Sequence, residues 1–200
     1  MNESNTPNIT YKNNWEIIQW TIPIIFSAPH AVPQTRKWQT KLCDEFTWDI
    51  VRQLCAKTWT YGVVRTENRD DDPNFYNTWL SLGFKEEIIN LIKDNDIKYW
   101  FDIHGCKDDL WLSIDIWTSY WENINQNLDF LVIVQKNLSN NFWRVAMDGI
   151  FDAGKSEIVS TYISHKTEIP YVQLEVCRAL RENTEYLVNL LSNLVIELLR

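Results

Sequence analysis

Glycine is scarce in this chain, which has five glycines among its 200 residues. Ordinary usage of about 7% would give roughly fourteen. Glycine is the residue that most easily adopts the positive φ angle of tight turns. We therefore expect several turns to be formed by other residue types, in a chain that also contains eleven tryptophans.

Positive charge is also in deficit, because 19 Lys and Arg residues face 27 Asp and Glu residues. The formal net charge is -8 and the pI is near 4.9. Binding of nucleic acid without sequence preference depends on an excess of Lys and Arg that neutralises phosphates. The composition argues against a nucleic-acid partner, whereas a few local arginines could still bind a small anionic substrate.

Long apolar runs and paired cysteines are missing as well. Residues 1–14 are polar, and the first apolar run, 22–28, is interrupted by Pro23. We therefore expect neither a signal peptide nor contact with a membrane. The cysteines form no CxxC pair, so we interpret them as reduced thiols of a cytosolic (cytoplasmic) protein. Cys106 remains a minor candidate for a nucleophile because it lies beside His104.

The chain does contain a regular alternation of strand and helix patterns. Its length and its 45% apolar content suit a single domain over residues 1–200, with 1–14 expected to be disordered. Strands are predicted at 15–20, 23–28, 61–65, 97–103, 111–117 and 169–176. Helices are predicted after Asp44 and at 82–93, 128–138, 157–166 and from Thr184 onward, while 31–42 and 66–77 are expected to be loops. This alternation predicts a three-layer α/β/α domain with a mixed, mostly parallel central sheet.

Two candidate site residues, Asp102 and His104, stand two apart at the end of one predicted strand. In an extended strand such residues point to the same face. A carboxylate beside an imidazole can fix its tautomer and raise its basicity, as metal-binding histidines usually require. The simpler alternative is a half-buried polar pair without a chemical role.

Polar residues also follow other predicted core strands. His30 comes after the first core strand, and Arg65 and Glu175 end two others. Open α/β sheets place their sites beyond the carboxyl ends of the strands. Two histidines and a carboxylate there are the ligand types of a catalytic zinc site, which has three protein ligands and an open fourth position.

Four segments together resemble the N-formylglutamate amidohydrolase family, whose fold is similar to that of the zinc carboxypeptidases (phosphorylase/hydrolase-like). The segments are 27–30 (SAPH), 65–74, 101–105 (FDIHG) and 172–175 (VQLE), in the family's order and at compatible distances. The resemblance covers about residues 22–181. It implies an enzyme with one Zn²⁺ that hydrolyses the amide of a small N-acyl amino acid, such as N-formyl-L-glutamate, by metal-activated water.

The resemblance also implies a set of metal ligands. His30 and His104 match the two histidine ligands of the family. Asp44 resembles the acid that opens the first helix in these amidohydrolases, and we select it as the third ligand. Gln34 and Glu45 are alternatives, and Asp44 could instead be a plain helix N-cap.

Glu175 matches the general base that would move a proton from water to the leaving amine. Its simpler alternative is a salt bridge to Arg178 or Arg181. Asp102 is assigned a supporting position behind His104, outside the set of metal ligands.

The resemblance further implies polar groups for substrate and transition state. Arg65 is the candidate for contact with the tetrahedral oxyanion. Arg65, Asn68 and Arg69 resemble groups that hold a substrate carboxylate, and Arg36 and Asn74 are further candidates for substrate binding. For each of them a solvated charged loop is the alternative.

Bulky indoles stand where the turns of the family would favour glycine, at Trp38, Trp48, Trp117 and Trp121. They could reshape or block the substrate pocket. Two other functions therefore stay open. One is a carboxypeptidase or poly-γ-glutamate type metallohydrolase, and the other is a catalytically inactive binding protein on the same fold.

Overall fold

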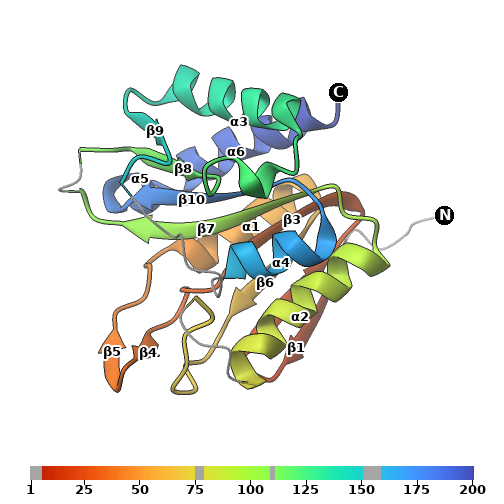
Figure 1. Ribbon diagram of the computed structural model, residues 1–200, viewed down its shortest axis with the longest axis vertical. Coiled ribbons are helices and arrows are strands. Elements are labelled where there is room, and N and C mark those ends of the chain that lie inside the picture. The colour runs from red at the N-terminus through yellow and green to blue at the C-terminus, as the bar shows by residue number, and fades with distance from the viewer. Residues whose placement is uncertain (1–5, 75–78, 109–110, 151–158) are drawn as a thin grey trace.

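The computed structural model describes residues 6–74, 79–108, 111–150 and 159–200. Within these residues eight strands form one sheet, in the order β1-β2-β6-β3-β7-β10-β8-β9 (Figure 1). The strands are β1 (Asn8–Lys12), β2 (Trp15–Gln19), β3 (Ile22–Ala28), β6 (Thr60–Arg65), β7 (Tyr99–Cys106), β8 (Ile114–Trp117), β9 (Val145–Met147) and β10 (Tyr171–Cys177).

The centre of the sheet is parallel. Strands β6, β3, β7 and β10 run in one direction, β2 and β8 flank them in the opposite direction, β1 is antiparallel to β2, and β9 is parallel to β8. Central strands with both faces covered are expected to be mostly apolar, and β3 has this character, whereas β10 is apolar except for Gln173 and Glu175. The mixed, mostly parallel sheet is confirmed.

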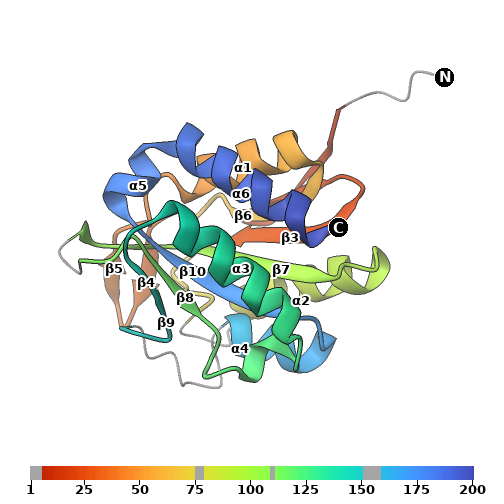
Figure 2. The same ribbon diagram turned by 90° about the horizontal axis from the view of Figure 1, so that it is seen from above.

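Helices cover both faces of the sheet (Figure 2). One layer contains α1 (Thr47–Thr58), α3 (Leu128–Asn141) and α6 (Thr184–Leu198), and the short helix α5 (Arg178–Glu182) precedes α6. The other layer contains α2 (Trp79–Asp94) and α4 (Val159–Thr167). Apolar stripes turn each helix toward the sheet, with Leu54 and Leu191 in one core and Phe84 and Ile163 in the other. The three-layer α/β/α architecture is therefore confirmed.

Most predicted elements lie where the patterns indicated, and the differences concern exposed or polar segments. The expected loop 31–42 contains a hairpin of β4 (Gln34–Arg36) and β5 (Gln39–Lys41). A 3-10 helix, η2 (Glu122–Ile124), and β9 were not predicted. Strand β7 extends to Cys106, three residues beyond the end of the predicted strand 97–103. None of the helices in the described segments is long and apolar enough to cross a membrane.

The prediction of disorder for residues 1–14 is wrong for 8–12, which form the edge strand β1. Its five residues pair in register with β2, from Asn8 opposite Gln19 to Lys12 opposite Trp15. Most of its side chains are exposed, so the segment lacks the apolar pattern of a core strand. Residues 1–5, and residues 75–77 of the predicted loop 66–77, lie outside the described part of the chain.

Turns with positive φ are made by residues other than glycine, as the composition indicated. Among the described residues fifteen non-glycine residues have positive φ, and no glycine does. Trp38 and Trp121 are two of them, with φ of 66° and 78°. Trp48 lies within α1 and Trp117 within β8, so the prediction that they occupy turns is wrong.

Candidate metal centre

The parallel strands β3, β7 and β10 bring the predicted histidines and glutamate to one edge of the sheet. His30 lies two residues beyond the end of β3, and His104 lies near the end of β7. Glu175 of β10 stands directly opposite His104 in the register of the two strands. Because neighbouring parallel strands end at the same edge, residues far apart in sequence meet there.

His30, Asp44 and His104 form a compact buried group whose donor atoms all lie within 4.8 Å of one another. Asp44 Oδ2 is 3.3 Å from His30 Nδ1 and 3.5 Å from His104 Nδ1. The two imidazole rings lie nearly perpendicular, with their centroids 4.6 Å apart. Two imidazole nitrogens and one carboxylate oxygen that converge in this way could hold a divalent metal ion.

Asp44 is not the cap of helix α1, because Phe46 occupies that position with φ of 70°. The backbone oxygen of Asp44 accepts hydrogen bonds from the Thr47 amide and hydroxyl. Its side chain is thus left for other partners, and Oδ2 accepts a hydrogen bond of 3.0 Å from the Gly105 amide. The carboxylate is held at the edge of the sheet and directed at the histidines.

Of the two alternatives to Asp44, Glu45 does not take part in this group. Glu45 forms an exposed ion pair of 2.9 Å with Arg178. Among the described His, Cys, Asp and Glu side chains, only His30, Asp44 and His104 form a group that could hold a metal ion. Gln34 is buried and stays an alternative.

Each histidine has a second carboxylate on the ring nitrogen that faces away from Asp44. His30 Nε2 lies 3.0 Å from Asp72 Oδ1, and His104 Nε2 lies 3.0 Å from Asp102 Oδ2. A carboxylate at Nε2 favours a proton there, so Nδ1 is the nitrogen that could offer a lone pair to a metal ion once its own proton, shared with Asp44, has been lost. This carboxylate–histidine arrangement is the usual support of a metal-binding imidazole, and Asp102 occupies the position behind His104 that the sequence indicated.

Asp72 was not predicted, although its side chain is fully buried against His30. Arg36 Nε donates to Asp72 Oδ2, and the Asn74 amide donates to Asp72 Oδ1 over 2.8 Å. The available signal was the run of three aspartates before Pro73 in a long loop. A proline after an acidic run fixes the backbone near a carboxylate, but only the fold shows which of the three meets a histidine.

The group carries an excess of buried negative charge. Burial acts to raise the Asp44 pKa, but hydrogen bonds from His104 and His30 outweigh it and hold this pKa far below its ordinary value. Burial acts to lower the pKa of His104, but the charge of Asp102 outweighs it and raises this pKa to about 10. In the metal-free chain a proton on His104 therefore balances part of the charge, and a divalent cation would take its place.

Glu175 is buried beside this group and forms no salt bridge to the arginines considered as its partners. Gln173 Nε2 donates to Glu175 Oε1 over 2.7 Å. Arg178 pairs instead with Glu45 and Glu182, and Arg181 donates to backbone oxygens. Burial raises the pKa of Glu175, as is common for a carboxylate that exchanges protons near neutral pH.

Cys106 is not suited to act as a nucleophile. Its sulfur is buried, and burial together with the charge of Glu175 raises the pKa of the thiol to about 12. The reactive form of cysteine is the thiolate, which is scarce at neutral pH when the pKa is this high.

Two of the predicted substrate-binding residues lie at the group, where one contacts a supporting carboxylate and the other contacts a histidine. Arg36 is ion-paired with Asp72. The Asn74 side-chain nitrogen lies 3.3 Å from His104 Nε2, and its oxygen accepts a hydrogen bond from the backbone of α4. Both residues therefore connect loops to the histidines.

The other predicted residues of segment 65–74 are engaged elsewhere. Arg65 is buried and forms an ion pair of 2.6 Å with Asp71. Asn68 donates to the hydroxyl of Thr35, and Arg69 pairs on the surface with the glutamate two residues before it. The structure does not bring Arg65, Asn68 or Arg69 into contact with His30, Asp44 or His104 through any hydrogen bond or ion pair among the described residues.

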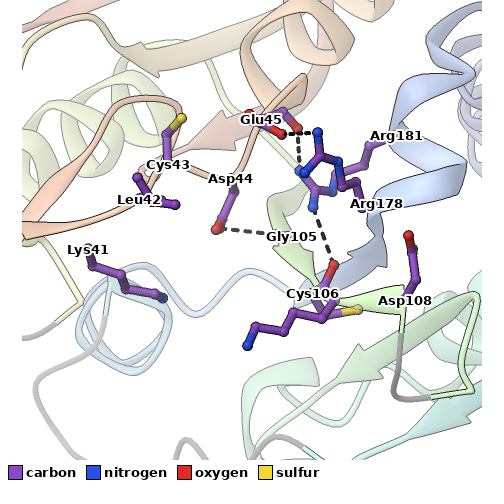
Figure 3. Close-up of a pocket in the computed structure, with 11 residues that line it drawn as sticks. Lys41, Leu42, Cys43, Asp44, Glu45, Gly105, Cys106, Asp108, Arg178 and Arg181 are labelled. Carbon is purple, nitrogen blue, oxygen red and sulfur yellow. Dashed lines mark hydrogen bonds and ion pairs between the residues drawn. The ribbon is translucent and has the colours of Figure 1, made fainter.

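A cavity of about 490 Å³ lies beside the group and includes Asp44 and Gly105 in its wall. Figure 3 shows the hydrogen bond between these two residues within the pocket, with Lys41 and Cys106 beneath it. Lys41 and Lys107 also line the cavity and are exposed. Neither lysine forms an ion pair with another described residue.

No protein-family model matches the sequence, and no curated protein is similar to it. Solved structures are similar in fold. N-formylglutamate amidohydrolase from Ralstonia eutropha is 8% identical, with a TM-score of 0.68 over 92% of this chain and 96% of that one. A metallo-carboxypeptidase from Burkholderia cenocepacia is 11% identical, with a TM-score of 0.61 over 96% and 64% of the two chains.

A bacteriophage poly-gamma-glutamate hydrolase is also similar, at 13% identity and a TM-score of 0.53 over 86% of this chain and 74% of that chain. Structural similarity at such low sequence identity establishes the fold, and the activity has to be argued from the site itself. The chain therefore has the zinc-carboxypeptidase-like fold that N-formylglutamate amidohydrolase and the metallo-carboxypeptidases share, as its sequence motifs predicted.

Proposed function

We propose that this chain is a metal-dependent hydrolase of amide bonds, with zinc as its metal and a small N-acyl amino acid such as N-formyl-L-glutamate as its substrate. The observation that carries the proposal is the buried group of His30, Asp44 and His104, with a second carboxylate behind each imidazole. Three protein ligands of these types suit a catalytic zinc ion with one open position. The excess of buried carboxylates around them also favours a divalent cation.

Proton transfer in the reaction would be carried out by side chains of the protein. Zinc in such a site lowers the pKa of its bound water to about 7 and polarises a carbonyl oxygen. Glu175 is placed to accept a proton from the attacking water and to deliver it to the nitrogen of the leaving amine. Its raised pKa brings it closer to the working pH, and Gln173 orients its carboxylate. An oxyanion contact from Arg65 stays a prediction, because its ion pair with Asp71 would have to rearrange.

The pocket beside Asp44 supports an anionic substrate derived from an amino acid. Lys41 and Lys107 form no ion pair with a described residue, and Arg178 and Arg181 line the same pocket, in a protein whose net charge is -8. A small dianion would be attracted to this local positive charge. Substrate binding by Arg36, Asn68, Arg69 and Asn74 stays a prediction, since each already has a protein partner.

A second candidate is hydrolysis of a γ-glutamyl chain. The cavity of about 490 Å³ is larger than one formylated amino acid needs, and its two lysines could contact successive carboxylates. The likeness in fold to the bacteriophage poly-gamma-glutamate hydrolase agrees with this candidate.

The test is hydrolysis by zinc-loaded protein of N-formyl-L-glutamate, N-acetyl-L-glutamate, γ-glutamyl oligomers and a neutral dipeptide. We expect release of formate or free amine from the anionic amides. His30→Ala and His104→Ala should abolish it, while His165→Ala, which alters an exposed histidine of α4, should not. Binding of these compounds without turnover would identify an inactive binding protein, and activity retained by both His30→Ala and His104→Ala would refute the proposal.

A further inference from the structure

A hydrogen-bonded chain of four buried side chains, Trp100, Ser27, Asp102 and His104, continues from the metal group into the core. Trp100, Asp102 and His104 alternate along β7, so their side chains lie on one face of the sheet. Ser27 of the neighbouring strand β3 stands directly opposite Asp102 in the parallel register. Ser27, Trp100 and Asp102 are all inaccessible to solvent. Water therefore has no access to these bonds, and each proton in the chain must be shared between side chains.

The direction of each hydrogen bond in this chain is fixed by chemistry. The indole of Trp100 can only donate, and its Nε1 lies 2.7 Å from Ser27 Oγ. Ser27 must accept that bond, so its single hydroxyl proton is free for Asp102 Oδ1, 2.5 Å away. Ser27 is thus the donor to Oδ1 of Asp102, and Trp100 holds Ser27 in place from behind. The other oxygen of Asp102, Oδ2, faces His104 Nε2 at 3.0 Å.

We propose that Ser27 and Trp100 are positioning residues that act through Asp102 to keep the proton of His104 on Nε2 and its Nδ1 directed at the metal group. The inference rests on the proposed function, because it assigns Nδ1 of His104 as a metal-binding atom. A carboxylate held by a hydroxyl cannot rotate away from the imidazole. The orientation of the ring is therefore set before any metal ion arrives.

The other histidine is supported differently. Asp72, behind His30, is held by Arg36, whose side chain is about one-third exposed, and by a backbone amide. The hydrogen-bonded side chains from Trp100 to His104, in contrast, all come from the two central strands β3 and β7.

The test compares Ser27→Ala with Ser192→Ala. Ser192 is also a buried serine, and its hydroxyl donates over 2.6 Å to a backbone oxygen within α6. The zinc dissociation constant is measured by competition with a chromophoric chelator, and the unfolding of each variant is followed in denaturant. Loss of an outer hydrogen-bond partner weakens metal binding about 10-fold or more. We expect that loss for Ser27→Ala and none for Ser192→Ala.

A double-mutant cycle with Asp102→Asn separates positioning from general packing. If Ser27 acts through Asp102, adding Ser27→Ala to Asp102→Asn should weaken zinc binding by less than twofold further, because contacting residues are not additive. A full and additive loss would overturn the inference. If Ser27→Ala does not fold, Trp100→Phe removes the first donor of the chain and is judged in the same way.

NMR of the metal-free protein provides an independent test, which measures proton exchange at His104. The Nε2 proton of His104 should be protected from exchange in the wild type and exchange faster in Ser27→Ala. A wild type that binds no zinc would refute the proposed function. The exchange rate of the His104 Nε2 proton would then be the remaining test of the role of Ser27. Equal zinc affinity in Ser27→Ala and Ser192→Ala, or equal exchange of the His104 proton in wild type and Ser27→Ala, would overturn it.

Discussion

Replacement of Asp72 by asparagine tests whether the carboxylate behind His30 supports metal binding. Asp72 is fully buried, and its Oδ1 lies 3.0 Å from His30 Nε2 while its other oxygen pairs with Arg36. Asparagine keeps the size of the side chain but removes its negative charge. Its NH₂ group would also face either His30 or Arg36, which both donate to Asp72 in the wild type. A hydrogen bond to a charged group is worth about 1.5–3 kcal/mol. Outer partners of metal-binding histidines change metal affinity by about 10–100-fold, or roughly 1.4–2.8 kcal/mol.

The assay is the zinc dissociation constant of Asp72→Asn at fixed pH and ionic strength, by competition with a chelator. We expect a value about 10–100 times that of the wild type. Asp115→Asn is the matched control, because Asp115 is also fully buried but accepts hydrogen bonds from the amides of Gly149 and Ile150 rather than from a histidine. Zinc binding by Asp72→Asn within twofold of the wild type would refute the reasoning.

Three further predictions concern protonation and backbone. The pKa of His104 is raised to about 10, so this residue keeps a proton that zinc must displace. Zinc affinity should therefore rise about tenfold per pH unit from pH 6 to 8. An affinity that does not change with pH would contradict this. Gly105→Ala would place a methyl group 2.5 Å from the guanidinium carbon of buried Arg181, so denaturant unfolding should show a loss of about 1–3 kcal/mol. Trp38→Gly should raise the free energy of unfolding by up to about 1 kcal/mol, because Trp38 is 97% exposed and strained at positive φ, and a lower value would count against strain there.

The core of the fold could be predicted because its strands are apolar and its helices are amphipathic. Strand β3 is largely apolar, β10 is apolar except for Gln173 and Glu175, and the leucine stripe of α6 defines one face. The edge strand β1 has no such pattern, since pairing with β2 stabilises it and its side chains remain exposed. Backbone pairing leaves no trace in hydrophobicity, so this strand was predicted as disordered.

Within the candidate site, residues attached to strands were easier to predict than residues in loops. His30, His104 and Glu175 follow or end apolar runs, and the strand order places them at one edge. Asp72 lies in a loop, and only the tertiary fold brings it to His30. Arg65 was predicted to contact substrate, because a sequence does not distinguish a buried ion pair from a free guanidinium.

The metal content of the purified protein tests the central claim most directly. Protein expressed and purified without added metal would be examined by elemental analysis, together with His30→Ala, His104→Ala and the exposed control His165→Ala. We predict about one zinc ion per chain in the wild type and in His165→Ala, and little in the other two variants, because a catalytic zinc site needs three protein ligands. A wild type without metal, or equal zinc in all four proteins, would contradict the account.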